Sequence, residues 1–154
     1  MTFVYNLRDG ELQDPDGPEG HRFRDFGVAR EAGAKLTGLG VYELPPGEAA
    51  WPYHFELNEE EWLIVVEGEV MLRTPDGERI LRAGDTACFP AGAAGAHAVR
   101  NAGSSTARFA MPSTEVPRGG AVVYPDSGKY SIYGPGFQHR GKLGEPVEYW
   151  EGEA

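Results

Sequence analysis

Short stretches of apolar residues, separated by turn residues, dominate the middle of the chain. Residues 37–44 read TGLGVYEL, in which side chains alternate in character as they do along a strand, and the PPG at 45–47 ends the pattern. Residues 62–66 form a continuous apolar run, WLIVV, which the polar EG pair ends. A run this short predicts a strand buried on both faces rather than a helix.

A hairpin and further short strands follow in the sequence. Residues 70–74 and 79–82 flank the turn PDGE, which has Asp-Gly at its tip, and this arrangement predicts a β-hairpin. Short strands at such spacing, with turns between them, are typical of a sandwich or a barrel. Three more strands are expected at residues 86–89, 97–101 and 107–111.

The strand pattern occupies only part of the chain. We expect an all-β domain, a small double-sheet β-barrel or jelly roll, at residues 37–112, with an N-terminal extension at 1–36 and a C-terminal extension at 113–154. The N-terminal extension is polar and irregular, and residues 125–154 are expected to wrap on the core. The 22 Gly and 12 Pro among 154 residues agree with a fold rich in turns.

Charge and composition exclude several classes of function. Lys and Arg number 14 and Asp and Glu number 24, so the net charge of −10 disfavours binding to nucleic acid or to anionic lipid. The sequence has no apolar run of about 18 residues and no sign of a signal peptide at its start. A single cysteine, Cys88, cannot form an internal disulfide and favours the reducing cytoplasm.

Four residues could carry chemistry: His54, Glu56, Glu61 and His97. Positions 54 and 56 share one face of a strand, because side chains alternate with a period of two. Imidazole and carboxylate donors from neighbouring strands could meet at one divalent ion, and this mixture suits zinc, manganese, iron, nickel or cobalt. Taken singly, a histidine in a strand is more often a packed or surface residue than a ligand, and Glu61 could belong to a solvated acidic run.

Aromatic residues surround these candidates, and one cysteine follows them. Trp51, Tyr53, Phe55 and Trp62 are expected mostly in the core, with one or two at the mouth of a pocket. Cys88 lies in the apolar stretch TACFP and is expected to be a small buried residue rather than a nucleophile.

Two spaced motifs contain the four candidates. The first reads Gly47, six residues, His54, one residue, Glu56, four residues, Glu61, six residues and a final glycine. It resembles the first motif of the cupin superfamily, G-x5-H-x-H-x3-4-E-x6-G. The second begins at residue 84 and reads G-x5-P-x-G-x4-H-x3-N with its histidine at 97, which resembles the second cupin motif. The chain resembles small single-domain bacterial cupins.

The resemblance implies a metal site with one substitution. Cupins usually present three histidines and one glutamate to a metal, so His54, Glu61 and His97 carry over directly, whereas Glu56 stands where the second histidine belongs. Glu56 could bind the ion through oxygen, or it could be a carboxylate of the pocket in a site without metal. The Gly/Ala loop at residues 91–96 is two residues longer than the motif has, a change that a flexible loop tolerates.

Two functions follow from this resemblance. The first is a metal-dependent enzyme or binder, possible reactions including isomerisation and dioxygenation, that acts on a small polar molecule inside the barrel. The second is a small-ligand binding or sensing protein without catalysis and without a required metal. A homodimer is also expected, because small barrels have exposed strand edges that a twofold partner can cover.

Overall fold

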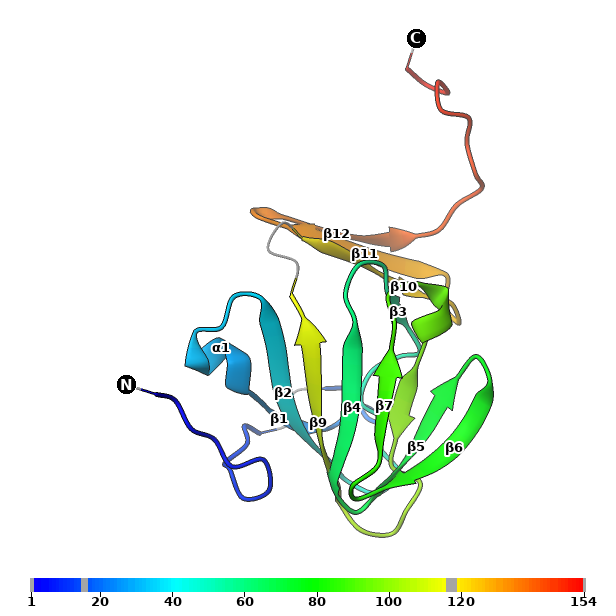
Figure 1. The fold of residues 1–154 in the computed structure, drawn as a ribbon. Coiled ribbons are helices and arrows are strands. Elements are labelled where there is room, and N and C mark those ends of the chain that lie inside the picture. Colours follow the sequence, from blue (N-terminus) through cyan, green and yellow to red (C-terminus); the bar gives the residue numbers. More distant parts are fainter. Residues whose placement is uncertain (1, 15–16, 116–118, 154) are drawn as a thin grey trace.

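The described residues of the chain, 2–14, 17–115 and 119–153 in a computed structural model, form mostly antiparallel β-structure (Figure 1). None of the described helices is long and apolar enough to cross a membrane. The strands are β1 (Arg24–Gly27), β2 (Thr37–Leu44), β3 (Phe55–Glu56), β4 (Glu61–Glu67), β5 (Glu69–Thr74), β6 (Gly77–Arg82), β7 (Thr86–Phe89), β8 (Ala98–Arg100), β9 (Ala107–Thr114), β10 (Gly120–Tyr124), β11 (Lys129–Gly134) and β12 (Phe137–Lys142). The helical elements are α1 (Val28–Ala32) and the 3-10 turn η1 (Ala93–Gly95).

Two sheets enclose one apolar core. A five-stranded sheet, in the order β1-β2-β9-β4-β7, lies against a three-stranded sheet, in the order β6-β5-β8. Their inward side chains meet in a single cluster, in which Phe109, Leu63 and Val99 are fully buried. Burial of each such side chain contributes about 1.5–3 kcal/mol to folding. The predicted all-β double-sheet barrel is therefore confirmed, and the predicted strands at 37–44, 70–74 and 107–111 fall inside β2, β5 and β9.

Strand β4 is buried on one face, not on both. Leu63 and Val65 are almost fully buried, whereas Trp62 on the opposite face is 44% exposed. Because side chains alternate, Glu61 shares the face of Leu63 and Val65, which directs its carboxylate into the barrel. Cys88 lies opposite Trp62 on β7 and is exposed, so the prediction that it is buried is wrong.

The first 36 residues contain more order than the sequence suggested. Strand β1 pairs with β2 at the edge of the five-stranded sheet, and α1 follows it directly. Residues before β1 cover the outer face of this sheet, where Leu12 packs with Val41 and Ala110. The buried Arg108 fixes this segment, because its Nε donates a hydrogen bond to the carbonyl of Leu7 at 2.8 Å.

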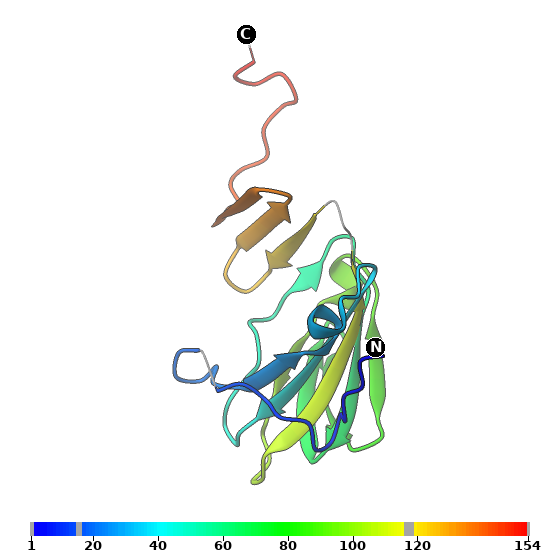
Figure 2. The same cartoon turned by 90° about the vertical axis from the view of Figure 1, so that its left-hand side faces the viewer.

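The C-terminal extension forms a third sheet. Strands β12, β11 and β10 are joined in that order to the two-residue strand β3, and this sheet lies across one end of the barrel (Figure 2). After Lys142 the chain leaves the body, and Tyr149 and Trp150 are 83% and 75% exposed. The extension thus builds a sheet instead of wrapping on the core, and its last part projects from it.

Candidate metal centre

Main-chain hydrogen bonds hold two of the candidate histidines side by side. His54 precedes β3 and His97 precedes β8, and the two residues form an isolated antiparallel bridge. The His54 amide donates to the His97 carbonyl at 3.1 Å, and the His97 amide donates to the His54 carbonyl at 2.8 Å. As a result the two rings lie with their centroids 4.7 Å apart.

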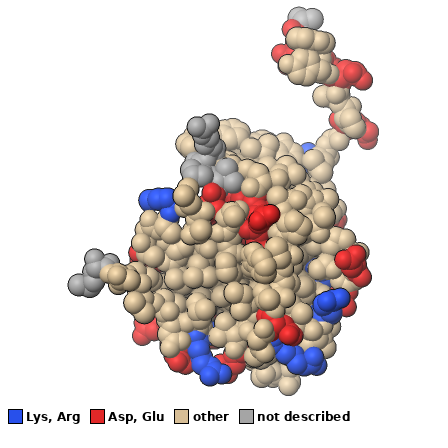
Figure 3. Space-filling view, in the orientation of Figure 1, with Lys and Arg blue, Asp and Glu red and all other residues tan. Residues whose placement is uncertain are grey.

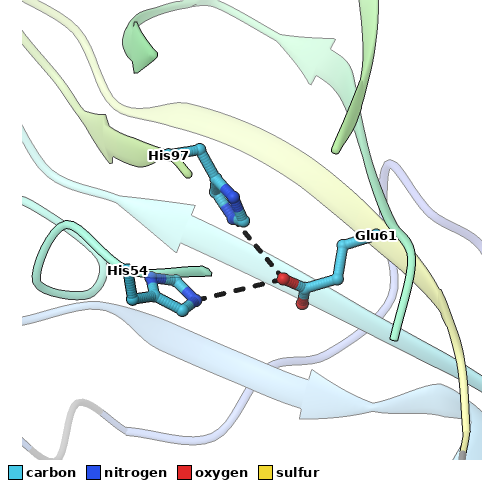
Figure 4. A group of neighbouring side chains, drawn as sticks. All are labelled: His54, Glu61 and His97. Carbon is cyan, nitrogen blue, oxygen red and sulfur yellow. Dashed lines mark ion pairs between the residues drawn. The ribbon is translucent and has the colours of Figure 1, made fainter. Parts of the chain in front are cut away.

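The carboxylate of Glu61 approaches both rings from β4 (Figure 4). Its Oε2 lies 3.6 Å from Nε2 of His97 and 3.9 Å from Nε2 of His54. One donor atom from each of the three residues can be chosen so that all lie within 4.8 Å of one another. The structure therefore brings together three of the four residues that the sequence singled out.

Carbonyl groups fix which nitrogen of each ring carries the proton. Nδ1 of His54 lies 2.9 Å from the Pro52 carbonyl, and Nδ1 of His97 lies 2.9 Å from the Gly95 carbonyl. A carbonyl oxygen can only accept, so each Nδ1 must donate. The Nε2 lone pair of each neutral ring is then left facing Glu61, which is the arrangement that metal-binding histidines adopt.

His97 is the most enclosed of the three donors. It is 1% exposed, its ring stacks on Phe89 at 3.7 Å, and its Nε2 is buried without a hydrogen-bond partner among the described residues. Burial, with a smaller contribution from His54, lowers the pKa of His97 to about 4. Burial likewise lowers the pKa of His54. Both rings are therefore neutral near pH 7, and the lines to Glu61 in Figure 4 do not join opposite charges.

The position of Glu61 requires a positive partner or a proton. Burial, and next the charge of Glu59, raises the pKa of Glu61 to about 7. An ionised carboxylate that faces two nitrogen lone pairs gains nothing from them, since none of the three can donate. Either a proton on Glu61 or a cation between the groups would remove this conflict.

The three donors fit a divalent ion. Contacts of 3.6 and 3.9 Å are too long for hydrogen bonds. Two ligand atoms that each lie about 2.0–2.2 Å from one ion are roughly 3.3–3.6 Å apart in tetrahedral geometry. A shift of a few tenths of an ångström would bring the Glu61 oxygen to such spacing from both rings, and two imidazoles with one carboxylate suit zinc, manganese, iron or nickel.

Glu56 lines the same cavity but lies outside this cluster of three. Its Oε2 is 3.5 Å from the hydroxyl of Tyr133, which also donates to Glu59 at 3.1 Å. Burial, and next the charges of Glu61 and Glu59, raises the pKa of Glu56 to about 8, while the Tyr133 hydroxyl acts against this rise. Glu56 as a fourth ligand remains a prediction.

A cavity of about 400 Å³ opens in front of the cluster. The volume lies in the range of small-molecule sites. Its walls combine the aromatic rings of Trp51, Tyr42 and Tyr124 with the carboxylates of Glu56 and Glu115. Trp51 also packs on the core, as expected for one of the aromatic residues near the motif. The arrangement can enclose a small molecule whose polar groups meet carboxylates and whose apolar face meets rings.

Comparison with known families and structures places this geometry in context. Residues 40–113 match the family model of the cupin domain, across both motifs and all four candidate ligands. Residues 40–113 are a domain of the cupin superfamily. No curated protein matches it.

Several solved structures share the fold. A sugar phosphate isomerase of the cupin superfamily from Silicibacter pomeroyi is 22% identical, with a TM-score of 0.80 over 95% of this chain and 97% of that chain. A cupin-like protein from Thermotoga maritima is 20% identical, with a TM-score of 0.60 over 70% and 81% of the two chains. A polyketide cyclase from Streptomyces resistomycificus is 22% identical, with a TM-score of 0.59 over 74% and 80%. At identities this low, structural similarity establishes the fold alone.

Other residues of the cupin motifs shape the barrel rather than the site. The Asn101 amide donates hydrogen bonds to the carbonyls of Leu44 and Ser105, both at 2.8 Å, and so closes a loop at the barrel end. Gly68 turns the chain from β4 to β5 at φ 74°, and a Cβ there would lie 2.9 Å from the carbonyl oxygen of Thr106. Both features orient the strands that carry the ligands.

Sequence reasoning missed several groups around this cupin cavity. Tyr124 from β10 stacks on His54, with ring centroids 6.0 Å apart, and Tyr133 from β11 contacts Glu56. Both come from the C-terminal sheet, outside the matched motifs. Arg30 from α1 also lines the cavity. The cross-strand pairing of β10 with β3 brings this sheet to the site, and a two-residue strand leaves no periodic signal in the sequence.

Proposed function

We propose that this cupin holds one divalent metal ion through His54, Glu61 and His97, and that it acts on a small polar molecule in the adjoining cavity. The observation that carries the proposal is the Nε2 of His97, which is buried, without a hydrogen-bond partner among the described residues, and faces Glu61. A buried polar atom without a partner is costly, and a ligand bond to a cation removes that cost. The chemistry is proposed to be metal-dependent, of the isomerase or dioxygenase type.

Each group in the cavity has a separate proposed task. When bound, a divalent ion with an open position polarises a carbonyl group or activates water or dioxygen. Trp51 and Tyr124 flank the space in front of His54 and exclude water from one side of a bound molecule. Glu56, held at Oε2 by the Tyr133 hydroxyl, either supplies a fourth ligand or holds and moves a proton at its free oxygen.

The second candidate function is ligand binding without catalysis. The separation of Glu56 from the cluster of three favours it, because a carboxylate outside the cluster can serve as a hydrogen-bonding group for a bound molecule. Metal-free protein that keeps its fold and binds the same small molecules with undiminished affinity would support this function against the first.

Metal analysis of purified variants tests the proposal. The parent should bind about one equivalent of divalent ion. In His97→Ala the amount of bound metal should fall at least several-fold, while the circular dichroism spectrum should still be that of an all-β protein. His139→Ala is the matched control, because His139 is exposed on β12, outside the cluster. Equal metal content in the parent and His97→Ala would overturn the proposed site.

The homodimer and the cytoplasmic location remain predictions. Exposed aromatic side chains at Tyr149 and Trp150 support a partner surface, since large apolar groups on a projecting segment favour burial. Light scattering at tens of micromolar protein should give the mass of a dimer, and a monomer would contradict the expectation. The cytoplasmic location rests on the lone Cys88.

A further inference from the structure

One basic side chain stands out along the cavity. Arg30, in α1, is the single arginine or lysine among the described residues that line it, and the acidic lining residues are Glu56, Glu61 and Glu115. The guanidinium lies over Gly27, with three of its atoms 3.4 Å from the position a Cβ would take there. The guanidinium thus lies close to the backbone at Gly27, at van der Waals distance from where a Cβ would stand.

Arg30 has no ion pair or side-chain hydrogen bond with the described residues. Arginines elsewhere in the fold are engaged: Arg73 forms two hydrogen bonds to Asp126, and Arg100 pairs with Glu78 at 3.2 Å. A guanidinium offers five donors in a fixed fork that matches carboxylate or phosphate oxygens. The donors of Arg30 are therefore free for a ligand in the cavity.

The strand order sets Arg30 and the metal cluster on different sides of the cavity. Arg30 follows β1 at one edge of the five-stranded sheet, Glu61 begins β4, and β2 and β9 lie between them. Gly38 and Gly40 of β2 lie between them on the cavity floor. A Cβ at Gly38 would collide with Ser113, and one at Gly40 with the Tyr42 hydroxyl. The Ser113 hydroxyl and the Tyr42 ring thus fill the space above these two glycines, and the two side chains form the floor between the two sides.

Charged groups on both sides of the cavity act on Tyr42. Its pKa is raised to about 12, chiefly by burial and next by the charges of Asp25 and Glu61, while Arg30 acts in the opposite direction. No hydrogen bond of its hydroxyl is formed with the described residues, so this group is free to bond a ligand that extends over Gly40.

We propose that Arg30 binds the anionic group of a small polyhydroxylated ligand whose other oxygens reach His54, Glu61 and His97. Ser113 and Glu115 on the floor and rim accept hydrogen bonds from the hydroxyl groups in the middle of the ligand. The inference rests on the proposed function and adds to it the ligand class and the residue that selects it. The anion is a carboxylate or a phosphate, since the guanidinium fork fits both.

The charge of the whole chain makes Arg30 decisive for such a ligand. The net charge is −10, and the face in Figure 3 shows acidic side chains near its upper middle and no broad basic patch among the residues described. The field of the protein therefore repels anions rather than collecting them. An anionic ligand must be held by a local contact, and its loss cannot be replaced by distant lysines or arginines.

Calorimetric titration of the manganese-loaded protein tests this role. The probes are gluconate, glucose 6-phosphate and, as the neutral polyol of the same length, sorbitol. At least one anion should bind the parent roughly tenfold or more tightly than sorbitol, because a charge-assisted pair is added to shared hydroxyl contacts. Arg30→Gln should lower the affinity for that anion to the level of sorbitol and leave sorbitol unchanged, and Arg30→Lys should retain part of the preference. The anion that binds more tightly identifies the group Arg30 prefers.

Arg79→Gln is the matched control, since it removes the same charge from an exposed position on β6 and should leave every affinity as in the parent. Equal binding of anions and sorbitol by the parent, binding of none of the three, or an anion preference that survives Arg30→Gln would overturn the role of Arg30. Manganese binding is measured first in each protein. Failure of the parent to bind manganese, zinc, iron or nickel would contradict the proposed metal site, whereas normal manganese binding without anion preference contradicts only the inference on Arg30.

Discussion

The cavity has two walls that are attached to the protein in different ways. The barrel wall carries Glu61 and His97 and continues into the apolar core around Phe109, which is fully buried. The rim wall carries Glu56, which the Tyr133 hydroxyl contacts, and Tyr124, and it belongs to the C-terminal sheet.

Polar contacts join the rim wall to the barrel. The two-residue strand β3 pairs with β10, and the bidentate pair of Arg73 with Asp126, at 2.6 and 3.0 Å, ties the turn after β10 to β5. Exposed ion pairs of this kind contribute little to stability. The barrel wall should therefore set stability and metal binding, whereas the rim wall should set which molecule binds.

The largest effect should come from the core under the barrel wall. Phe109→Ala removes a fully buried ring that packs against Tyr42 and Trp51, and should lower the free energy of unfolding by about 3–5 kcal/mol. Denaturant unfolding followed by circular dichroism measures this loss. Ile132→Ala on β11, where the side chain is 43% exposed, should cost far less. Similar costs at both positions would contradict the division between the walls.

Next in size is the loss of a metal ligand. Glu61→Gln should lower the affinity for divalent ions by about 100-fold or more, because removal of groups that only orient metal ligands already lowers metal affinity by 10–100-fold. The fold should persist, since the amide has no charge to bury beside the two histidines. Competition titration with a metal-binding dye gives the affinity. Glu67→Gln is a suitable control at an exposed position of the same strand, and an affinity unchanged by Glu61→Gln would remove Glu61 from the site.

Glu56 decides how far the metal site extends into the rim wall. If Glu56 is a ligand, Glu56→His should raise the affinity for nickel relative to manganese, because imidazole favours nickel and oxygen donors favour manganese. Glu56→Gln should then lower the affinity for every divalent ion. Competition titrations of the three proteins distinguish the alternatives. If Glu56→Gln binds metal as well as the parent does, Glu56 contacts the bound molecule or transfers a proton instead.

The smallest effect is expected from Tyr133. Tyr133→Phe removes the hydroxyl that lies 3.1 Å from Glu59 and 3.5 Å from Glu56, and should cost about 0.5–1.5 kcal/mol of unfolding free energy. Metal affinity should change little, while binding of small molecules in the cavity should weaken, because the Glu56 carboxylate loses its anchor. Calorimetric titration of the same preparation with the metal ion and with the small molecule separates the two effects. A loss of metal affinity as large as that of Glu61→Gln would place Tyr133 with the barrel wall.

The two walls also differ in how well the sequence predicted them. His54, Glu61 and His97 stand at the spacing of the two motifs, and this spacing predicted that they meet. Tyr124 and Tyr133 lie 27 and 36 residues beyond His97, where no motif indicates that β10 pairs with β3. Cys88 was misplaced because an apolar strand sequence does not reveal which face meets solvent at a sheet edge.

The N-terminal part illustrates the same limit. Residues 24–27 carry no strong strand pattern, and their pairing with β2 becomes visible only in three dimensions. Arg30 follows that strand, so its place on the cavity could not be predicted from its neighbours in the sequence.

X-ray absorption spectroscopy of the zinc-loaded protein tests the metal centre most directly. The account predicts outer-shell scattering from two imidazole rings, together with oxygen from at least one carboxylate. In His97→Ala that scattering should fall to one ring or the bound zinc should be lost, and in His139→Ala it should match the parent. A spectrum of the parent with oxygen ligands alone, or one that His97→Ala leaves unchanged, would contradict the proposal that His54, Glu61 and His97 hold the ion.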